Sequence, residues 1–249
     1  DTTIWANNPT ARRTYRALTA VWDWRPSNKL QVLGNYTYSK TRGNYEGEGA
    51  NTPASGSPIG NYPRSSDFAA TNPDGALSGD IPHRLNLLGS YRFAAKPWGA
   101  LTAGGGLRYQ SGLPYSLTAA VPLLDDDAYL GDAGTTYTHF FSRRGEFRFD
   151  DWWSADLSLR YELPAFRGLG AFVKLAVLNV TNNDAVVQFS TAGTSGRDSD
   201  TDAVLPWQAV GNCGPGDRPS KSCTGFGRIR SEADYQDPRQ IQLTIAIDF

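Results

Sequence analysis

Apolar and polar residues alternate along most of this chain. Between His83 and Phe93, for example, Leu85, Leu87 and Tyr91 stand on one side of the chain, and polar residues such as Asn86 stand on the other. The same alternation occurs in segments 15–25, 30–40, 83–93, 101–111, 153–161, 171–180 and 239–249. A period of two residues is typical of a β-strand, whereas an amphipathic helix has a period of 3.6 residues. The pattern predicts an all-β protein with about seven strands.

These segments are longer than the strands of soluble proteins. Soluble strands usually have about five or six residues, whereas most of these have roughly eleven. Eleven residues at about 3.3 Å each, tilted by about 45°, rise roughly 26 Å. That height matches the apolar band of a transmembrane β-barrel, in which only every second residue is apolar.

The connections between the segments alternate between short and long. Segments 26–29, 94–99 and 163–168 are short, and segments 41–82, 118–152 and 181–238 are long. Barrels of the bacterial outer membrane have short periplasmic turns and long extracellular loops. We therefore expect an antiparallel, up-and-down barrel with three long, irregular extracellular loops.

Seven strands predict an incomplete barrel. Bacterial single-chain barrels have an even number of strands, from eight upward, and an open sheet edge is not stable in lipid. The sequence contains no methionine and begins at Asp1 without a signal peptide. We expect residues 1–249 to be the C-terminal portion of a larger barrel, with earlier strands absent.

Composition excludes several other classes of function. Lysine and arginine total 24 against 25 aspartate and glutamate, so bulk charge favours neither nucleic acid nor an anionic surface as partner. No apolar run is long enough for a transmembrane helix. Neither His83 nor His139 has a nucleophile or a spaced acid around it, and we expect no catalytic residues, no cofactor and no metal.

Six stretches, in order, are similar to the C-terminal barrel region of TonB-dependent outer-membrane receptors, particularly the Oar-like group. The stretches are "NYTYSKTRGN" (35–44), "DIPHRLNLLGSYRF" (80–93), "LRYQSGLPYS" (107–116), "RRGEFRFDDWWSADLSLRYEL" (143–163), "LNVTNN" (178–183) and "DPRQIQLTIAIDF" (237–249). The resemblance implies a ligand-gated importer of a scarce solute. In such receptors an N-terminal plug closes a barrel of about 22 strands, and the TonB complex supplies energy through the plug.

Two other classes of function remain open. One is a passive porin or a barrel-anchored adhesin without an energised plug. The other is a soluble β-rich carbohydrate-binding domain, such as a lectin-like sandwich, in which the face of Leu85, Leu87 and Tyr91 packs against a second sheet.

Alternation also predicts which residues line the lumen. The candidates for contact with a solute are Arg84, Arg92, Arg108, Gln110, Asp156 and Arg160. The alternative role for each is packing and hydrogen bonding, against the plug or between strands. The glycine run 104–106 lies in mid-strand and predicts bending or close approach of a neighbour.

Aromatic residues near strand ends predict the membrane boundaries. We expect Trp24, Phe93 and Phe249 at the periplasmic boundary, and Tyr36, Tyr38 and Tyr109 at the opposite one. Phe249 also resembles the C-terminal signal read by the barrel assembly machinery, with Gln242, Thr244 and Ile247 in the preceding places and Thr244 where glycine is usual. The alternative is an apolar strand that ends in phenylalanine by chance.

The long loops contain two further features. Cys213 and Cys223 are ten residues apart in a loop rich in glycine and proline, which favours a local disulfide in an oxidising compartment. The acidic runs 125–127 and 198–202 suggest a calcium site, but the second lacks the glycine and glutamate of an EF-hand loop. Solvated acidic loops are the favoured interpretation.

Overall fold

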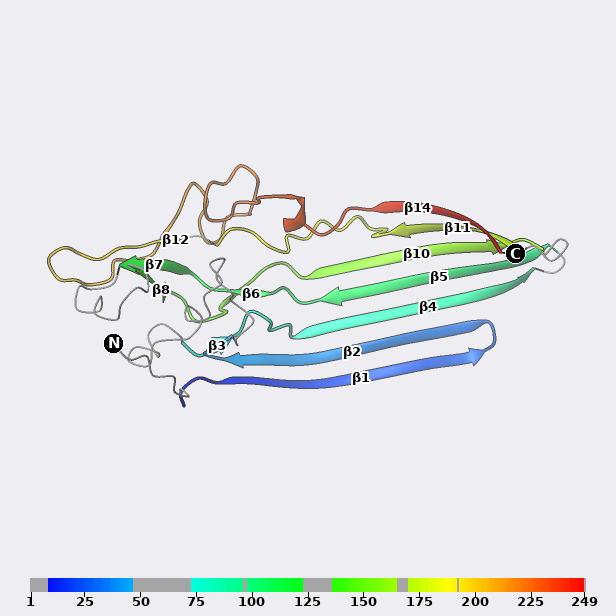
Figure 1. Cartoon of the computed structure of the whole chain (residues 1–249), viewed down its shortest axis with the longest axis horizontal. Helices are drawn as coiled ribbons and strands as arrows, with labels where there is room; N and C mark the ends of the chain where they lie inside the picture. The colour runs from blue at the N-terminus through cyan, green and yellow to red at the C-terminus, as the bar shows by residue number, and fades with distance from the viewer. Residues whose placement is uncertain are drawn as a thin grey trace, which may run out of the picture.

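The long strands form one open antiparallel sheet (Figure 1). The computed structural model describes residues 9–46, 73–95, 98–122, 136–164, 170–191 and 193–248. The strands are β1 (Arg13–Ser27), β2 (Leu30–Gly43), β4 (His83–Ala95), β5 (Gly99–Gln110), β10 (Trp152–Glu162), β11 (Gly170–Leu178) and β14 (Gln240–Asp248). Each pairs with the next in this order. The up-and-down arrangement of seven strands is therefore confirmed.

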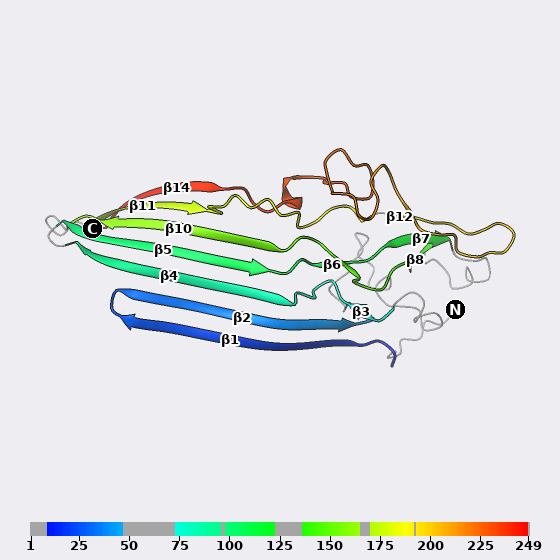
Figure 2. The ribbon, with the colours of Figure 1, turned by 180° about the vertical axis from the view of Figure 1, so that it is seen from behind.

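The short elements all lie beyond one end of this sheet, and the tight β1–β2 turn lies at the other end (Figures 1 and 2). The short strands are β3 (Gly75–Ala76), β6 (Pro114–Tyr115), β7 (Thr118–Pro122), β8 (Thr136–Phe140), β9 (Phe147–Arg148), β12 (Gly193–Thr194) and β13 (Gln208–Ala209), with a 3-10 turn at Glu232–Asp234. They pair as β2–β3, β6–β9, β7–β8 and β12–β13. The long connections are therefore less irregular than the sequence predicts.

The pairing register brings the apolar residues of all seven strands onto one face of the sheet. Leu85 is opposite Tyr36 on β2 and Tyr109 on β5, and Leu175 is opposite Leu243. Directly paired residues project to the same side of a sheet. A one-residue slip along a whole pairing would send a strand's apolar residues to the other face. Among the described pairings a register shift occurs between Trp24 and Ser27, at the turn end of β1, and it leaves the rest of that strand in register.

This apolar face is uncovered. Leu18 is 74% exposed, Leu157 is 57% exposed and Ile241 is 71% exposed. No second sheet packs against the face within the described ranges. A soluble sandwich would bury these side chains against another layer, so the lectin-like alternative does not fit the structure.

Apart from Ala176 on β11, the buried apolar residues of the described ranges lie beyond the long strands, in the layer formed by the long connections. Leu77 and Val121 are fully buried, and Cys223, Phe226 and Ile229 are at most 2% exposed. The connections therefore fold as a layer with its own apolar interior. Among the described residues no helix has the length and apolar character needed to cross a membrane.

Gly34 on β2 provides space for a tryptophan on the apolar face. A Cβ at Gly34 would lie 2.2 Å from Cζ2 of Trp22, the residue opposite it on β1. At Gly89, on the same face of β4, the nearest atom would be 3.9 Å away. The indole of Trp22 therefore covers Gly34, and Gly89 has open space.

We expect Gly34→Ala to destabilise the protein by about 1–3 kcal/mol, because the added methyl group displaces the indole. Urea-induced unfolding from lipid vesicles measures the change. Gly89→Ala is the matched control and should change stability by less than about 1 kcal/mol. Equal losses for the two variants would contradict the role given to Trp22.

Candidate functional site

The six residues predicted to face the lumen share the face opposite the apolar one. Arg84 is opposite Gln110, and Gln110 is opposite Trp152. The same register continues along the strands to Arg92, Arg108, Asp156 and Arg160. This face is a candidate solute pathway, and it brings together charged residues of β4, β5 and β10.

Asp156 on β10 joins two strands to the start of the last long connection. Its carboxylate accepts hydrogen bonds from Arg108 at 2.9 Å, from the hydroxyl of Ser154 at 2.9 Å and from the backbone N–H of Asn179 at 2.9 Å. Asn179 follows β11 with a φ of 47°, in the left-handed region that asparagine tolerates better than most residues. Arg108 and Asp156 are therefore engaged in interstrand contacts.

Arg92 and Arg160 form a second group near the tight-turn end. Both pair with Glu162, at 3.1 Å and 3.4 Å respectively, and the Arg160 guanidinium lies 3.9 Å from the centre of the Phe172 ring. Arg84, in contrast, forms no ion pair with any residue that the structure describes. The charge of Arg84 is therefore exposed on this polar face without an ionic partner among the described residues.

Two hollows open along this face. One, of about 300 Å³, lies over Gly104 and Gly106 and is bordered by Leu88 and Lys174. A Cβ at Gly104 would approach the Ser158 hydroxyl to 2.8 Å, so the glycines permit close approach of a neighbouring strand. The other hollow, of about 290 Å³, is lined by Gln110, Ser111, Gly112, Leu113, Asp150, Trp152 and Val187.

A continuous series of aromatic rings runs through the extracellular layer. Tyr115 contacts Phe149 and Phe189, with ring centres 4.9 and 5.2 Å apart. Phe189 leads to Phe226 at 5.8 Å, and Phe226 to Trp207 at 5.5 Å. These rings join the β5–β10 connection to the β11–β14 connection, and all except Phe226 are partly exposed.

Two ion pairs hold the connections together: the first is largely buried, and in the second only the carboxylate is buried. Arg144 pairs with Glu46 at 2.8 Å, and their side chains are 8% and 14% exposed. Arg148 pairs with Asp80, whose other carboxylate oxygen accepts the backbone N–H of Thr41 at 2.6 Å. Sequence reasoning missed these pairs, although Arg144 and Arg148 lie in one of the quoted stretches.

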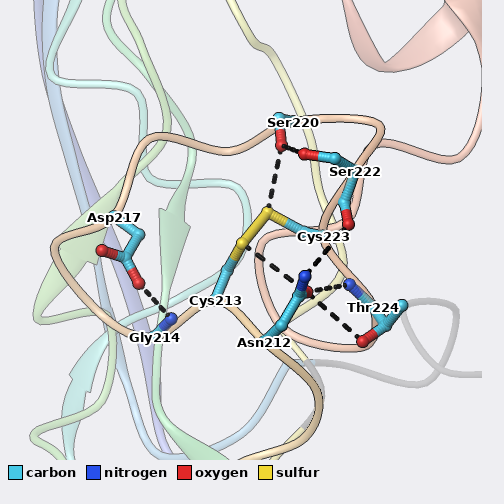
Figure 3. The surroundings of a disulfide bond; sticks show 8 residues. All are labelled: Asn212, Cys213, Gly214, Asp217, Ser220, Ser222, Cys223 and Thr224. Carbon is cyan, nitrogen blue, oxygen red and sulfur yellow. Dashed lines mark hydrogen bonds between the residues drawn. A yellow bond between two sulfur atoms is a disulfide. The ribbon is translucent and has the colours of Figure 1, made fainter.

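Cys213 and Cys223 are joined by a disulfide, with Cα atoms 5.5 Å apart (Figure 3). The side-chain oxygen of Asn212 accepts the backbone N–H of Thr224 at 2.6 Å, which holds the two ends of the loop together. Asp217 accepts the N–H of Gly214 at 2.6 Å within the loop. Cys223 is 1% exposed, so one end of the bridge belongs to the core of the layer.

Removing the bridge with Cys213→Ser/Cys223→Ser should cost about 2–3 kcal/mol of local stability, because a ten-residue loop is no longer closed in the unfolded state. Hydrogen exchange of the amides of residues 205–230 measures the loss. A reductant should have the same effect on the parent protein and none on the variant. Unchanged protection in the double variant would show that Asn212 and the aromatic contacts suffice.

The predicted boundary residues lie at opposite ends of the apolar face. Trp24 and Phe93 lie near the tight turns and are 56% and 45% exposed. Tyr109 lies near the other end of β5, where its hydroxyl donates to Asp151 at 2.6 Å. Trp98, which sequence reasoning did not single out, lies at the β4–β5 turn and is 76% exposed. Phe249 lies outside the described residues.

The acidic run 198–202 forms a hydrogen-bonded turn. The hydroxyl of Thr201 and the N–H groups of Asp200 and Thr201 donate to Asp198 and lower the pKa of its carboxyl. No cluster of metal-ligating residues occurs in the part of the chain that the structure describes. The run 125–127 lies outside that part.

Two other titratable groups in the extracellular layer have shifted pKa values. Burial lowers the pKa of His139, and the nearby Arg197 lowers it further. Burial raises the pKa of Tyr115, within the aromatic series. Both shifts favour the neutral side chain, which suits a packed layer rather than a proton-transfer site.

A protein-family comparison agrees with this geometry. A family model described as an outer membrane beta barrel domain matches residues 2–242. No curated protein matches the chain, and no solved structure matches it. The match, the open antiparallel sheet and the exposed apolar face together place the chain in the bacterial outer membrane. The chain belongs to the outer membrane beta barrel family.

Proposed function

We propose that the chain forms the last strands and the surface loops of a TonB-dependent receptor that imports a scarce solute. The main support for the proposal is that the folded extracellular layer connects directly to the polar face of the sheet. The hollow next to Gln110 and Trp152 lies where β5 and β10 reach that layer. A solute held by the layer would thus meet polar groups of the lumen directly.

Strand direction supports a larger barrel. Seven antiparallel strands leave β1 and β14 running in the same direction, so these edges cannot pair with each other in an antiparallel barrel. Two copies inserted with the same orientation meet the same obstacle. An odd number of further strands, which we assign to the rest of the polypeptide, is needed for closure.

In the proposed mechanism the solute meets the described residues in order, from the cell surface towards the periplasm. The partly exposed rings around Tyr115 provide contact area for the solute at the cell surface. Arg84, Gln110 and Trp152 then offer a charge, an amide and an indole at the upper lumen. The plug, coupled to the TonB complex, would open the path below them.

Conductance of the whole polypeptide in a planar bilayer tests this function, with potassium chloride as the probe. A plugged receptor should be silent until mild urea unfolds the plug, and should then conduct reversibly. Steady conductance without urea would contradict the proposal and indicate a passive porin. Silence at every urea concentration that leaves the barrel folded would also contradict it and favour an adhesin.

The C-terminal strand has a separate proposed partner. β14 is the last described strand, and Ile241, Leu243, Ile245 and Ile247 are each more than 60% exposed on the apolar face. We propose that this strand, with Phe249, is the segment that the barrel assembly machinery recognises. The remaining partners on the apolar face are membrane lipids.

A further inference from the structure

The apolar face carries a cluster of basic residues at its extracellular end. Lys40 on β2 is directly opposite Arg16 on β1. Arg42 follows two residues after Lys40 and therefore projects to the same side. All three are exposed, and the face below them continues with Leu18 and Tyr38. We call Arg16, Lys40 and Arg42 the basic triad.

The triad is electrostatically uncompensated. Like charges on directly opposite residues of a sheet are destabilising, and the Cβ atoms of such a pair are about 5 Å apart. None of the three forms an ion pair with a described residue. The one interaction of its charged atoms found there is Lys40 Nζ over the Tyr38 ring, 5.6 Å from its centre.

The nearby acidic residues are committed elsewhere. Asp74 pairs with Arg12 at 3.1 Å. Glu46 and Asp80 pair with Arg144 and Arg148 inside the extracellular layer. An anion for the triad therefore has to come from outside the described part of the chain.

The position of the triad along the membrane normal indicates which kind of anion lies beside it. Lys40 lies two residues beyond Tyr38, which is about 7 Å along the strand and about 5 Å along the membrane normal at a 45° tilt. Tyrosine on the lipid-facing side marks the level of the headgroups. Because the apolar face below the triad contacts acyl chains, the groups beside the triad are the headgroups of the outer leaflet.

We propose that the basic triad is a binding site for a phosphorylated lipid headgroup of the outer leaflet. Arginine matches phosphate with two parallel hydrogen bonds, and lysine adds a compact charge between the two arginines. The acyl chains of the same lipid lie along Leu18, Tyr36 and Tyr38. This site is independent of the proposed import function, because it lies on the outer wall of the barrel.

The test measures binding of a bis-phosphorylated lipid A to the whole polypeptide in detergent by native mass spectrometry. Arg16→Gln/Lys40→Gln/Arg42→Gln should weaken binding on the order of tenfold or more. The matched control is Arg218→Gln/Lys221→Gln/Arg228→Gln, which removes three exposed positive charges from the extracellular layer. The control should bind as the parent protein does.

A second variant separates binding from folding. Lys40→Glu places a carboxylate opposite Arg16, so it should raise the melting temperature in lipid-free detergent while it weakens lipid binding by a similar factor. Equal binding by the triple variant and its control would overturn the site. So would equal binding of dephosphorylated lipid A, or inorganic phosphate stabilising the parent protein as much as the lipid at equal concentration.

Discussion

Leu243→Arg should destabilise the barrel by about 2–4 kcal/mol, because the substitution places a charge against the hydrocarbon of the bilayer. Leu243 lies on the apolar face of β14, is 65% exposed and is opposite Leu175. In a soluble protein an exposed leucine can be replaced by arginine at little cost, usually within about 0.5 kcal/mol. The size of the loss therefore identifies the solvent on that side as lipid.

The neighbouring residue provides the control. Gln242 lies on the opposite face of the same strand, across from Ala176, and Gln242→Arg should change the free energy of unfolding by less than about 1 kcal/mol. Reversible urea unfolding from vesicles measures both variants. A larger loss for Gln242→Arg than for Leu243→Arg would mean that the faces are assigned the wrong way round.

Arg144→Met should destabilise the extracellular layer by roughly 3–5 kcal/mol, because it leaves the carboxylate of Glu46 buried without its partner. Glu46→Gln should have a smaller effect, because the amide oxygen still accepts from Ser78. The double variant should recover part of the loss, with a coupling energy of about 1–3 kcal/mol. Hydrogen exchange of the amides of residues 136–148 measures each value.

An exposed ion pair in the same layer is the matched control. Arg12 and Asp74 are 66% and 51% exposed, and their coupling should be at most about 1 kcal/mol. Similar coupling for both pairs would mean that burial of Arg144 and Glu46 adds nothing. Loss of the main sheet in Arg144→Met would show that the layer does not unfold independently.

The sheet was predictable because lipid and water impose a period of two residues on every strand. The alternation in 83–93 and 153–161 indicates both the strands and their apolar faces, and strand direction follows from the alternation of short and long connections. The residues at which the strands begin and end were less predictable. β1 begins at Arg13 and β2 continues to Gly43. In these extensions Arg16 and Lys40 interrupt the apolar pattern beyond the apolar band of the sheet.

The extracellular layer could not be predicted from local patterns. Arg144 and Glu46 are 98 residues apart in the chain, and the aromatic series depends on contacts among separate connections. β7 and β8 pair across segment 123–135, with no alternation long enough to distinguish them from a loop. Six lumen candidates were placed on one face by alternation alone, but the ion pairs of Arg92, Arg108, Asp156 and Arg160 depend on register.

A cysteine scan of β4 from Leu85 to Phe93 tests the central claim that one face of the sheet contacts lipid and the other contacts water. The two native cysteines of the chain are joined in a disulfide, so each new thiol is labelled with an environment-sensitive dye. Dyes at positions 85, 87, 89, 91 and 93 should be quenched by nitroxide-bearing lipids, and those at 86, 88, 90 and 92 by a water-soluble quencher. Quenching without a two-residue period, or with the reverse phase, would contradict the claim.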